Sequence, residues 1–126
     1  MLVVDDQTYF RGVLGELVAA TAGFTLVGNA SDGEQALSLT AELGPDFVLM
    51  DIRMPGLDGV AAARVMVERH PRVVVLLVSA HDSPTAAGLA RSAARVHFAE
   101  KRELSCSMLR RVWSDRESDN AGGASG

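Results

Sequence analysis

Short apolar runs recur along the chain, separated by longer stretches in which apolar residues return every three or four positions. Runs of this kind are typical of strands that are buried on both faces of a sheet. The run at 73–78 is the clearest, whereas 24–28 alternates between apolar and polar positions. The predicted strands are residues 2–4, 24–28, 47–50, 73–78 and 95–98.

The stretches between the runs have the helical period, and turn residues separate them from the strands. Alternating strands and helices predict an α/β fold with a doubly wound, five-stranded parallel sheet, because right-handed crossovers connect the strands. The predicted helices are residues 7–22, 32–43, a segment from the N-cap Asp58 to Pro71, 83–93, and a last helix with Leu104, Met108, Leu109 and Val112 inward.

The last part of the chain lacks this periodicity. From Ser114 onward it contains mainly Ser, Asp, Gly and Asn. We therefore expect one domain over residues 1–113 and a flexible tail or interdomain linker over residues 114–126.

The amino-acid composition limits the class of protein and its cellular environment. A chain of 126 residues that is 48% hydrophobic can form one sizeable core. Its formal net charge of -4 argues against nucleic-acid contact or an anionic membrane surface in this segment. The only cysteine is Cys106, so no internal disulfide can form. We find no apolar run that could span a membrane and no leader, and expect a cytoplasmic protein.

Polar residues follow the predicted strands. Asp5 and Asp6 follow the first, Asp51 the third, Ser79 the fourth, and Lys101 lies shortly after the fifth. The carboxyl ends of parallel strands meet at one edge of the sheet, where open α/β sheets bind ligands. Three carboxylates crowded there would repel one another, and a divalent cation would relieve that repulsion. Hard oxygen ligands without nearby His or Cys indicate Mg²⁺.

Magnesium held by few carboxylates usually binds a phosphate as well. Lys101 would supply a second positive charge for that phosphate, and Ser79 a hydroxyl donor. The sequence therefore predicts a site for metal-assisted phosphate chemistry.

Four motifs in order support a family resemblance: residues 2–6 (LVVDD), 51–59 (DIRMPGLDG), 77–80 (LVSA), and Phe98 with Lys101 three residues later. With them, the chain resembles the receiver domain of bacterial two-component response regulators from Leu2 to about Trp113. Residues 51–56 look most like the subfamily in which a LuxR-type DNA-binding domain follows the receiver. The resemblance implies a flavodoxin-like (βα)5 fold with strand order 2-1-3-4-5.

The resemblance also implies roles for the polar residues. Asp51 would be the phosphoacceptor. Asp6, Asp51 and the backbone carbonyl of Arg53 would hold Mg²⁺, and Asp5 would reach the metal through water. Lys101 would neutralise charge on the phosphoryl oxygens during transfer.

A switch would follow phosphorylation. Ser79 would move to bond the attached phosphoryl group, and Phe98 would swing inward, although an aromatic residue on a short strand is as often plain core. Arg53 and His81 would flank the phosphoryl site and tune how fast water reaches the acyl phosphate, unless they are merely exposed loop residues.

The implied protein is a signalling switch rather than an enzyme, with at most slow Mg²⁺-dependent self-dephosphorylation. Its donor would be a sensor histidine kinase or a phosphotransfer protein, and its output transcription, with a homodimer on phosphorylation as one route. A stand-alone receiver acting in a phosphorelay or through protein contacts is the alternative.

The sequence departs from the family at two places. Arg102 follows the lysine, where many receivers have proline. Before and beside the aromatic residue, where the family often has small glycine-bearing steps, this chain has Ala94, Arg95 and His97. These departures put the fifth strand and its output surface in question. A degenerate receiver that acts only as a binding surface is disfavoured by the intact acids, serine and lysine.

Two other classes of protein share parts of the pattern. An aspartyl phosphohydrolase needs a second acid two residues after its nucleophile, where this chain has Arg53. A flavodoxin-like cofactor module needs a Ser/Thr/Gly-rich phosphate loop after the first strand, where this chain has Asp5 and Asp6.

Overall fold

The structure is a computed structural model that describes the backbone of residues 1–125 and the side chains of residues 1–116. Five strands form one parallel sheet in the order β2-β1-β3-β4-β5, as the family resemblance implied. The strands are β1 (Leu2–Val4), β2 (Gly28–Ala30), β3 (Phe47–Asp51), β4 (Val74–Ser79) and β5 (Val96–Glu100). The helices are α1 (Thr8–Ala20), α2 (Gly33–Leu43), α3 (Gly59–Arg69), α4 (Pro84–Ser92), the 3-10 helix η1 (Lys101–Glu103) and α5 (Cys106–Ser125).

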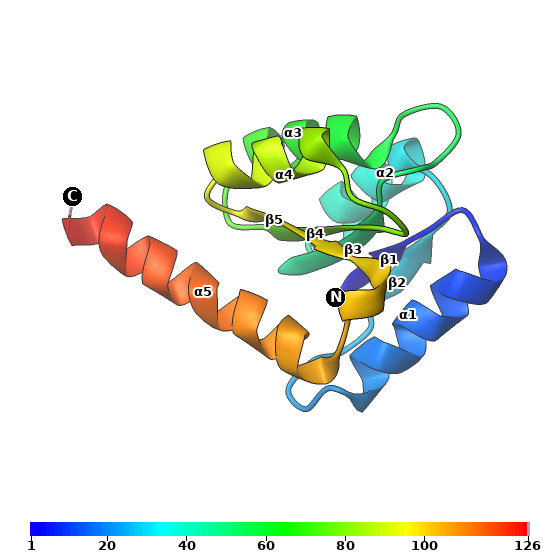
Figure 1. The fold of residues 1–126 in the computed structure, drawn as a ribbon, viewed down its shortest axis with the longest axis horizontal. Helices are drawn as coiled ribbons and strands as arrows, with labels where there is room; N and C mark the ends of the chain where they lie inside the picture. The colour runs from blue at the N-terminus through cyan, green and yellow to red at the C-terminus, as the bar shows by residue number, and fades with distance from the viewer. Residues whose placement is uncertain (126) are drawn as a thin grey trace.

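Helices cover both faces of the sheet, with α1 and α5 on one face and α2, α3 and α4 on the other (Figure 1). Two apolar clusters fill the layers between sheet and helices. Every residue of β3 and β4 is buried, because these central strands have helices on both faces. The continuous apolar runs that predicted the strands are the direct result of this double coverage.

Helix boundaries follow from local hydrogen bonding. The side chains of Asp32, Asp58 and Ser83 each accept a hydrogen bond from a backbone N–H in the first turn of α2, α3 and α4. Gly44 ends α2 in the left-handed conformation with φ 58°. The predicted N-cap at Asp58 is confirmed.

The predicted position of the second strand is wrong. The strand lies at Gly28–Ala30 rather than at residues 24–28, and pairs with β1 in the register Leu2↔Gly28 to Val4↔Ala30. β1 has only three residues with which β2 can pair. The alternating residues before Gly28 instead place Phe24 and Leu26 against the apolar cluster between the sheet and helices α1 and α5, called here the α1/α5 cluster, which includes Leu14, Val18, Leu109 and Val112. Propensity could not indicate this shift, because Gly28 and Asn29 are poor strand formers.

In the rest of the chain the structure differs from the predicted element boundaries in smaller ways. The last residues of β3 and β4 are Asp51 and Ser79, so both polar residues still belong to the sheet ladder. The helix α5 runs to Ser125, past the point where the apolar period stops. Arg116 lies over the Trp113 ring at 3.7 Å, a contact that supports a further turn without any apolar repeat. The division into a domain and a tail at residue 114 stays a prediction.

The described part of the chain contains no helix with both the length and the apolar character needed to cross a bilayer.

Two glycines allow the loop between β3 and α3 to approach the backbone closely. A Cβ added at Gly59 would lie 2.3 Å from the Asp51 carbonyl oxygen and 2.8 Å from the Ile52 Cα. A Cβ at Gly33 would lie 2.4 Å from the Leu57 carbonyl oxygen. The first turn of α3 therefore rests directly on the end of β3, which fixes where Asp51 leaves the sheet.

We predict that Gly59→Ala lowers the free energy of unfolding by at least about 2 kcal/mol, because backbone atoms must move to admit the methyl group. Urea denaturation followed by circular dichroism measures the change. Gly12→Ala in α1 is the matched control, since nothing lies within 4 Å of its added Cβ. It should raise stability by up to about 1 kcal/mol. Equal effects of the two substitutions would contradict the proposed close approach.

Candidate functional site

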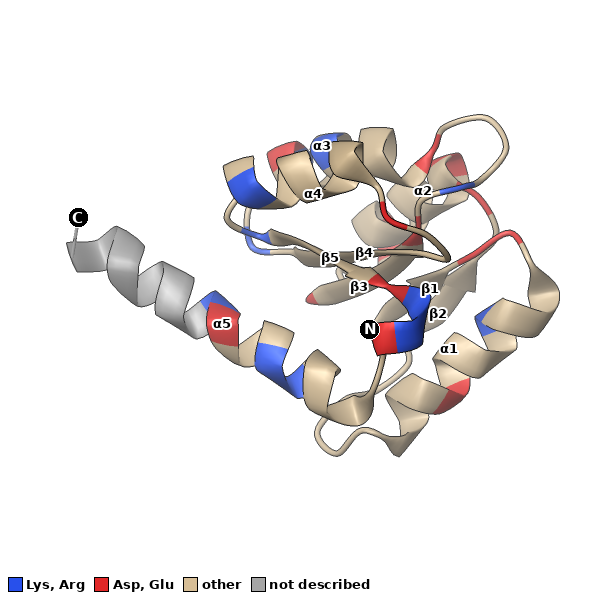
Figure 2. Cartoon of the chain, viewed as in Figure 1, with Lys and Arg blue, Asp and Glu red and all other residues tan. Residues whose placement is uncertain are grey.

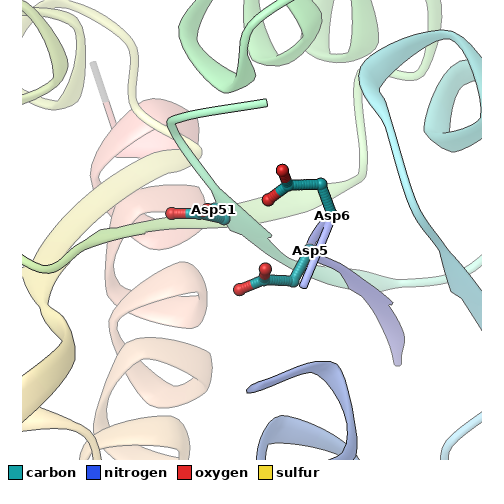
Figure 3. A group of neighbouring side chains, drawn as sticks. All are labelled: Asp5, Asp6 and Asp51. Atoms are coloured by element: carbon teal, nitrogen blue, oxygen red, sulfur yellow. The ribbon is translucent and has the colours of Figure 1, made fainter. Parts of the chain in front are cut away.

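Three carboxylates meet at the carboxyl ends of β1 and β3. Val4 pairs with Met50, so the residues that follow them, Asp5 and Asp51, emerge side by side. Each of Asp5, Asp6 and Asp51 offers a carboxylate oxygen, and these oxygens all lie within 4.8 Å of one another. Figure 3 shows the three carboxyl groups pointing to the same side of the two strands. The sequence prediction that these acids converge is confirmed.

Asp5 is the most firmly held of the three acids. It is fully buried, and its Oδ1 accepts a hydrogen bond of 2.9 Å from the Gln7 N–H. Its backbone carbonyl accepts a hydrogen bond of 2.8 Å from the Arg11 guanidinium, and its N–H donates to the Ala30 carbonyl. Asp6 is exposed, so one acid is locked by α1 while its neighbour faces solvent.

Lys101 brings positive charge to the acids from η1. Its Nζ lies 3.3 Å from Asp5 Oδ2 and 3.6 Å from Asp51 Oδ1. Figure 2 shows basic and acidic residues together on the short turn that follows β5. The backbone around Lys101 is held by a local capping arrangement. Glu100 and Glu103 form a reciprocal capping box around η1, in which the Glu103 carboxylate accepts from the Glu100 N–H at 2.9 Å.

Asp51 is buried and only 5% exposed. Burial raises the pKa of the Asp51 carboxyl above 3.8, and the negative charges of Asp5 and Asp6 raise it further. The Lys101 ammonium and a hydrogen bond from the Arg53 backbone oppose this rise in pKa without cancelling it. The carboxylate form of Asp51 is therefore destabilised, and an added cation would stabilise it.

The acidic group fits Mg²⁺. Its donors are hard carboxylate oxygens from three residues, and the ammonium of Lys101 is the one positive charge paired with them. The donor set and the excess charge together favour a hard divalent cation over a bare ion-pair network.

The remaining predicted site residues lie around this group. Ser79 ends β4, beside β3, and is 4% exposed; its Oγ accepts a hydrogen bond of 3.3 Å from the His81 N–H. Arg53 and His81 are both exposed in the loops after β3 and β4. Phe98 on β5 is partly buried and packs against the cluster beneath α2, α3 and α4. Their roles in tuning or switching stay predictions.

Sequence reasoning missed three parts of the site. Phe10 was not predicted to belong to the site, yet its ring lies over Lys101 Nζ at 3.9 Å from the ring centroid. Arg11 holds the Asp5 carbonyl, and Glu103 caps η1. Only the pairing of Glu100 with Glu103 three positions later was visible in the sequence, as a capping-box spacing.

Fold and site together define the class: a doubly wound parallel sheet that carries an acid cluster and a lysine at its carboxyl edge. The sequence matches the response regulator receiver domain over residues 1–111. The chain therefore belongs to the response regulator receiver domain family.

Relatives of known description agree with this assignment. A transcriptional regulatory protein DegU from Brevibacillus brevis is 39% identical over 82 residues, 65% of this chain and 35% of that protein. A positive alginate biosynthesis regulatory protein from Pseudomonas aeruginosa is 46% identical over 83 residues, 65% of this chain and 34% of that protein. A protein-glutamate methylesterase/protein-glutamine glutaminase from Symbiobacterium thermophilum is 39% identical over 117 residues, 91% of this chain and 32% of that protein. The chain thus spans about a third of the length of these relatives.

Solved structures show the same fold. The receiver domain of NarL from Mycobacterium tuberculosis is 29% identical with a TM-score of 0.76, covering 92% of this chain and 94% of that one. A LuxR-family response regulator from Aurantimonas has a TM-score of 0.81 at 24% identity, covering 93% of this chain and 84% of that one. The second similarity concerns the fold alone.

The raised pKa of Asp51 predicts how stability depends on pH. Below the ordinary pKa of an aspartate, Asp51 is protonated in the folded and unfolded states and no penalty exists. As pH rises through the higher folded-state pKa, ionisation removes stability. Without divalent cations, Asp51→Asn should therefore be more stable than the parent near neutral pH, and this gain should vanish as the pH falls below the ordinary pKa of an aspartate.

Urea titrations over this pH range, with EDTA present, measure the difference. Asp46→Asn is the matched control, because Asp46 precedes β3 at its opposite end and is exposed. Magnesium should stabilise the parent more than the Asp51→Asn protein. A gain for Asp51→Asn that is the same at every pH would show that charge is not its cause.

Proposed function

We propose that this chain is a phosphorylation-activated signalling switch that accepts a phosphoryl group on Asp51 from a phosphohistidine. The observation that carries the proposal is the buried Asp51 carboxylate, with two further carboxylates within 4.8 Å and Lys101 Nζ at 3.6 Å. The donor would be a sensor histidine kinase or a phosphotransfer protein.

Asp5, Asp6 and Asp51, with the backbone carbonyl of Arg53, would hold Mg²⁺. The bound ion would supply positive charge that neutralises the phosphoryl oxygens during transfer. The buried position of Asp5 and the exposed position of Asp6 support a division in which Asp5 orients the site and Asp6 binds the ion directly.

Transfer itself needs little from the protein beyond positioning and charge. An oxygen of the Asp51 carboxylate attacks phosphorus while the N–P bond of the phosphohistidine breaks, and the electron pair of that bond stays on the imidazole nitrogen. Burial of Asp51 at the strand end limits the access of water to the resulting acyl phosphate. Lys101, already between Asp5 and Asp51, neutralises charge on the transferred group.

A change of surface would follow. We propose that Ser79 bonds the attached phosphoryl group and that Phe98 moves further into the apolar cluster it already borders. Both residues lie on neighbouring strands, β4 and β5, so a shift at Ser79 acts directly on the surface formed by α4 and β5. This is a two-state switch that a local charge biases.

The output would be transcription. DegU of Brevibacillus brevis and the alginate regulator of Pseudomonas aeruginosa support this choice by their descriptions. Relatives described as protein-glutamate methylesterases offer a different output. The full coding region decides between them: a DNA-binding domain supports the proposal, and a methylesterase domain contradicts it.

A phosphohydrolase is disfavoured at the same site. Such an enzyme needs an acid two residues after its nucleophile to protonate the leaving group. Arg53 occupies this position and is exposed in the loop after β3.

We predict that incubation with Mg²⁺ and acetyl phosphate adds one phosphoryl group to the parent protein, detected by intact-mass spectrometry. Asp51→Asn should gain none, whereas Asp46→Asn should behave like the parent because Asp46 lies at the other end of β3. Removing Mg²⁺ with EDTA should slow the reaction at least tenfold, since the crowded carboxylates then lack their counter-charge. If Asp51→Asn is phosphorylated, or if the parent protein is not, the proposal is wrong.

The lifetime of the phosphorylated protein should depend on the two exposed side chains near the site. Arg53→Ala or His81→Ala should shorten it severalfold, because each truncation opens the loop around the acyl phosphate to water. Loss of label after removal of the donor measures the lifetime. If both variants have the same lifetime as the parent, Arg53 and His81 are exposed loop residues without a role in controlling the access of water.

A further inference from the structure

An aromatic ring completes the surroundings of the lysine. Phe10 on α1 is partly buried, and its ring centroid lies 3.9 Å from Lys101 Nζ. The same ammonium contacts Asp5 Oδ2 at 3.3 Å and Asp51 Oδ1 at 3.6 Å, and the lysine side chain is only 17% exposed. A cation over an aromatic face is attracted by the ring quadrupole, more strongly where water is excluded.

We propose that Phe10 is a positioning residue for Lys101, which its ring face holds at the phosphoryl site. This inference rests on the proposed function. The two carboxylates attract the ammonium only while they carry free negative charge, and that charge is shared or removed when a metal binds or when Asp51 is modified. The attraction of the ring does not depend on these events, so Phe10 keeps the lysine in place throughout the reaction.

The helix that carries Phe10 is itself fastened to the site. Arg11, the next residue, donates to the Asp5 carbonyl, and the N-cap Gln7 donates to the Asp5 side chain. Further along α1, Leu14 and Val18 are fully packed against the sheet. The ring and Asp5 therefore hold fixed positions relative to each other, and the ammonium lies in contact with both.

A simpler reading is that Phe10 only fills space at the edge of the α1/α5 cluster. Phe24 provides a matched comparison, because it is a partly buried phenylalanine packed against the same cluster. Its ring contacts Phe47 and Trp113 rather than the lysine. Phe24→Leu removes an aromatic ring from that layer without touching Lys101.

Lys101 is the only lysine in the sequence, which makes its side chain directly observable. Protein labelled with ¹³C-lysine gives one set of lysine side-chain signals, recorded without metal or donor. The ε-methylene protons should show an upfield ring-current shift in the parent, in Phe10→Tyr and in Phe24→Leu. This shift should disappear in Phe10→Leu.

Phosphorylation by acetyl phosphate then tests the consequence. Phe10→Leu should react about three- to tenfold more slowly than the parent. Its affinity for Mg²⁺, measured by thermal shift, should stay unchanged because the substitution leaves the three carboxylates in place. Phe10→Tyr should restore the rate, and Phe24→Leu should keep it.

The outcomes separate this inference from the proposed function. If the parent is phosphorylated and Phe10→Leu reacts equally fast, or the parent shows no ring-current shift, the positioning role is wrong while the switch stands. If Phe24→Leu slows the reaction as much as Phe10→Leu does, the ring contributes packing alone. If the parent accepts no phosphoryl group, both proposals fail.

Discussion

The structure depends on an excess of negative charge at the buried edge of a parallel sheet. Strands β1 and β3 deliver Asp5 and Asp51 side by side, and Lys101 meets both at salt-bridge distance. One ammonium faces three carboxylates there, and burial together with the neighbouring acids raises the pKa of Asp51. An added cation would therefore stabilise the site, and the surrounding backbone keeps the acids from moving apart.

That backbone support comes from both sides of the sheet. On the α3 side, Gly59 lets the helix start rest on the Asp51 carbonyl, so the strand end cannot relax. On the α1 side, Arg11 and Gln7 hold Asp5, and Phe10 faces the lysine. An electrostatic penalty persists in a folded protein only where packing prevents its release. Here two helices on opposite faces prevent it.

Local hydrogen bonds shape the segment that carries Lys101 to the site. Arg102 follows Lys101, and a capping box between Glu100 and Glu103 shapes the turn. The strand before it still pairs with β4 up to Ser79↔Glu100. The capped turn after β5 brings the Lys101 ammonium to Asp5 and Asp51.

Sequence alone determined the α/β class and most element positions, because strands that are buried on both faces consist of continuous apolar runs. It also determined the convergence of Asp5, Asp6, Asp51 and Lys101, because the carboxyl ends of parallel strands lie at one edge of the sheet. It misplaced β2, whose short ladder depends on its partner β1 rather than on propensity. It also did not place Phe10 beside Lys101. Such features arise from contacts between residues distant in the chain, which no local pattern records. Only the tertiary structure decided which side of α1 would face an ammonium.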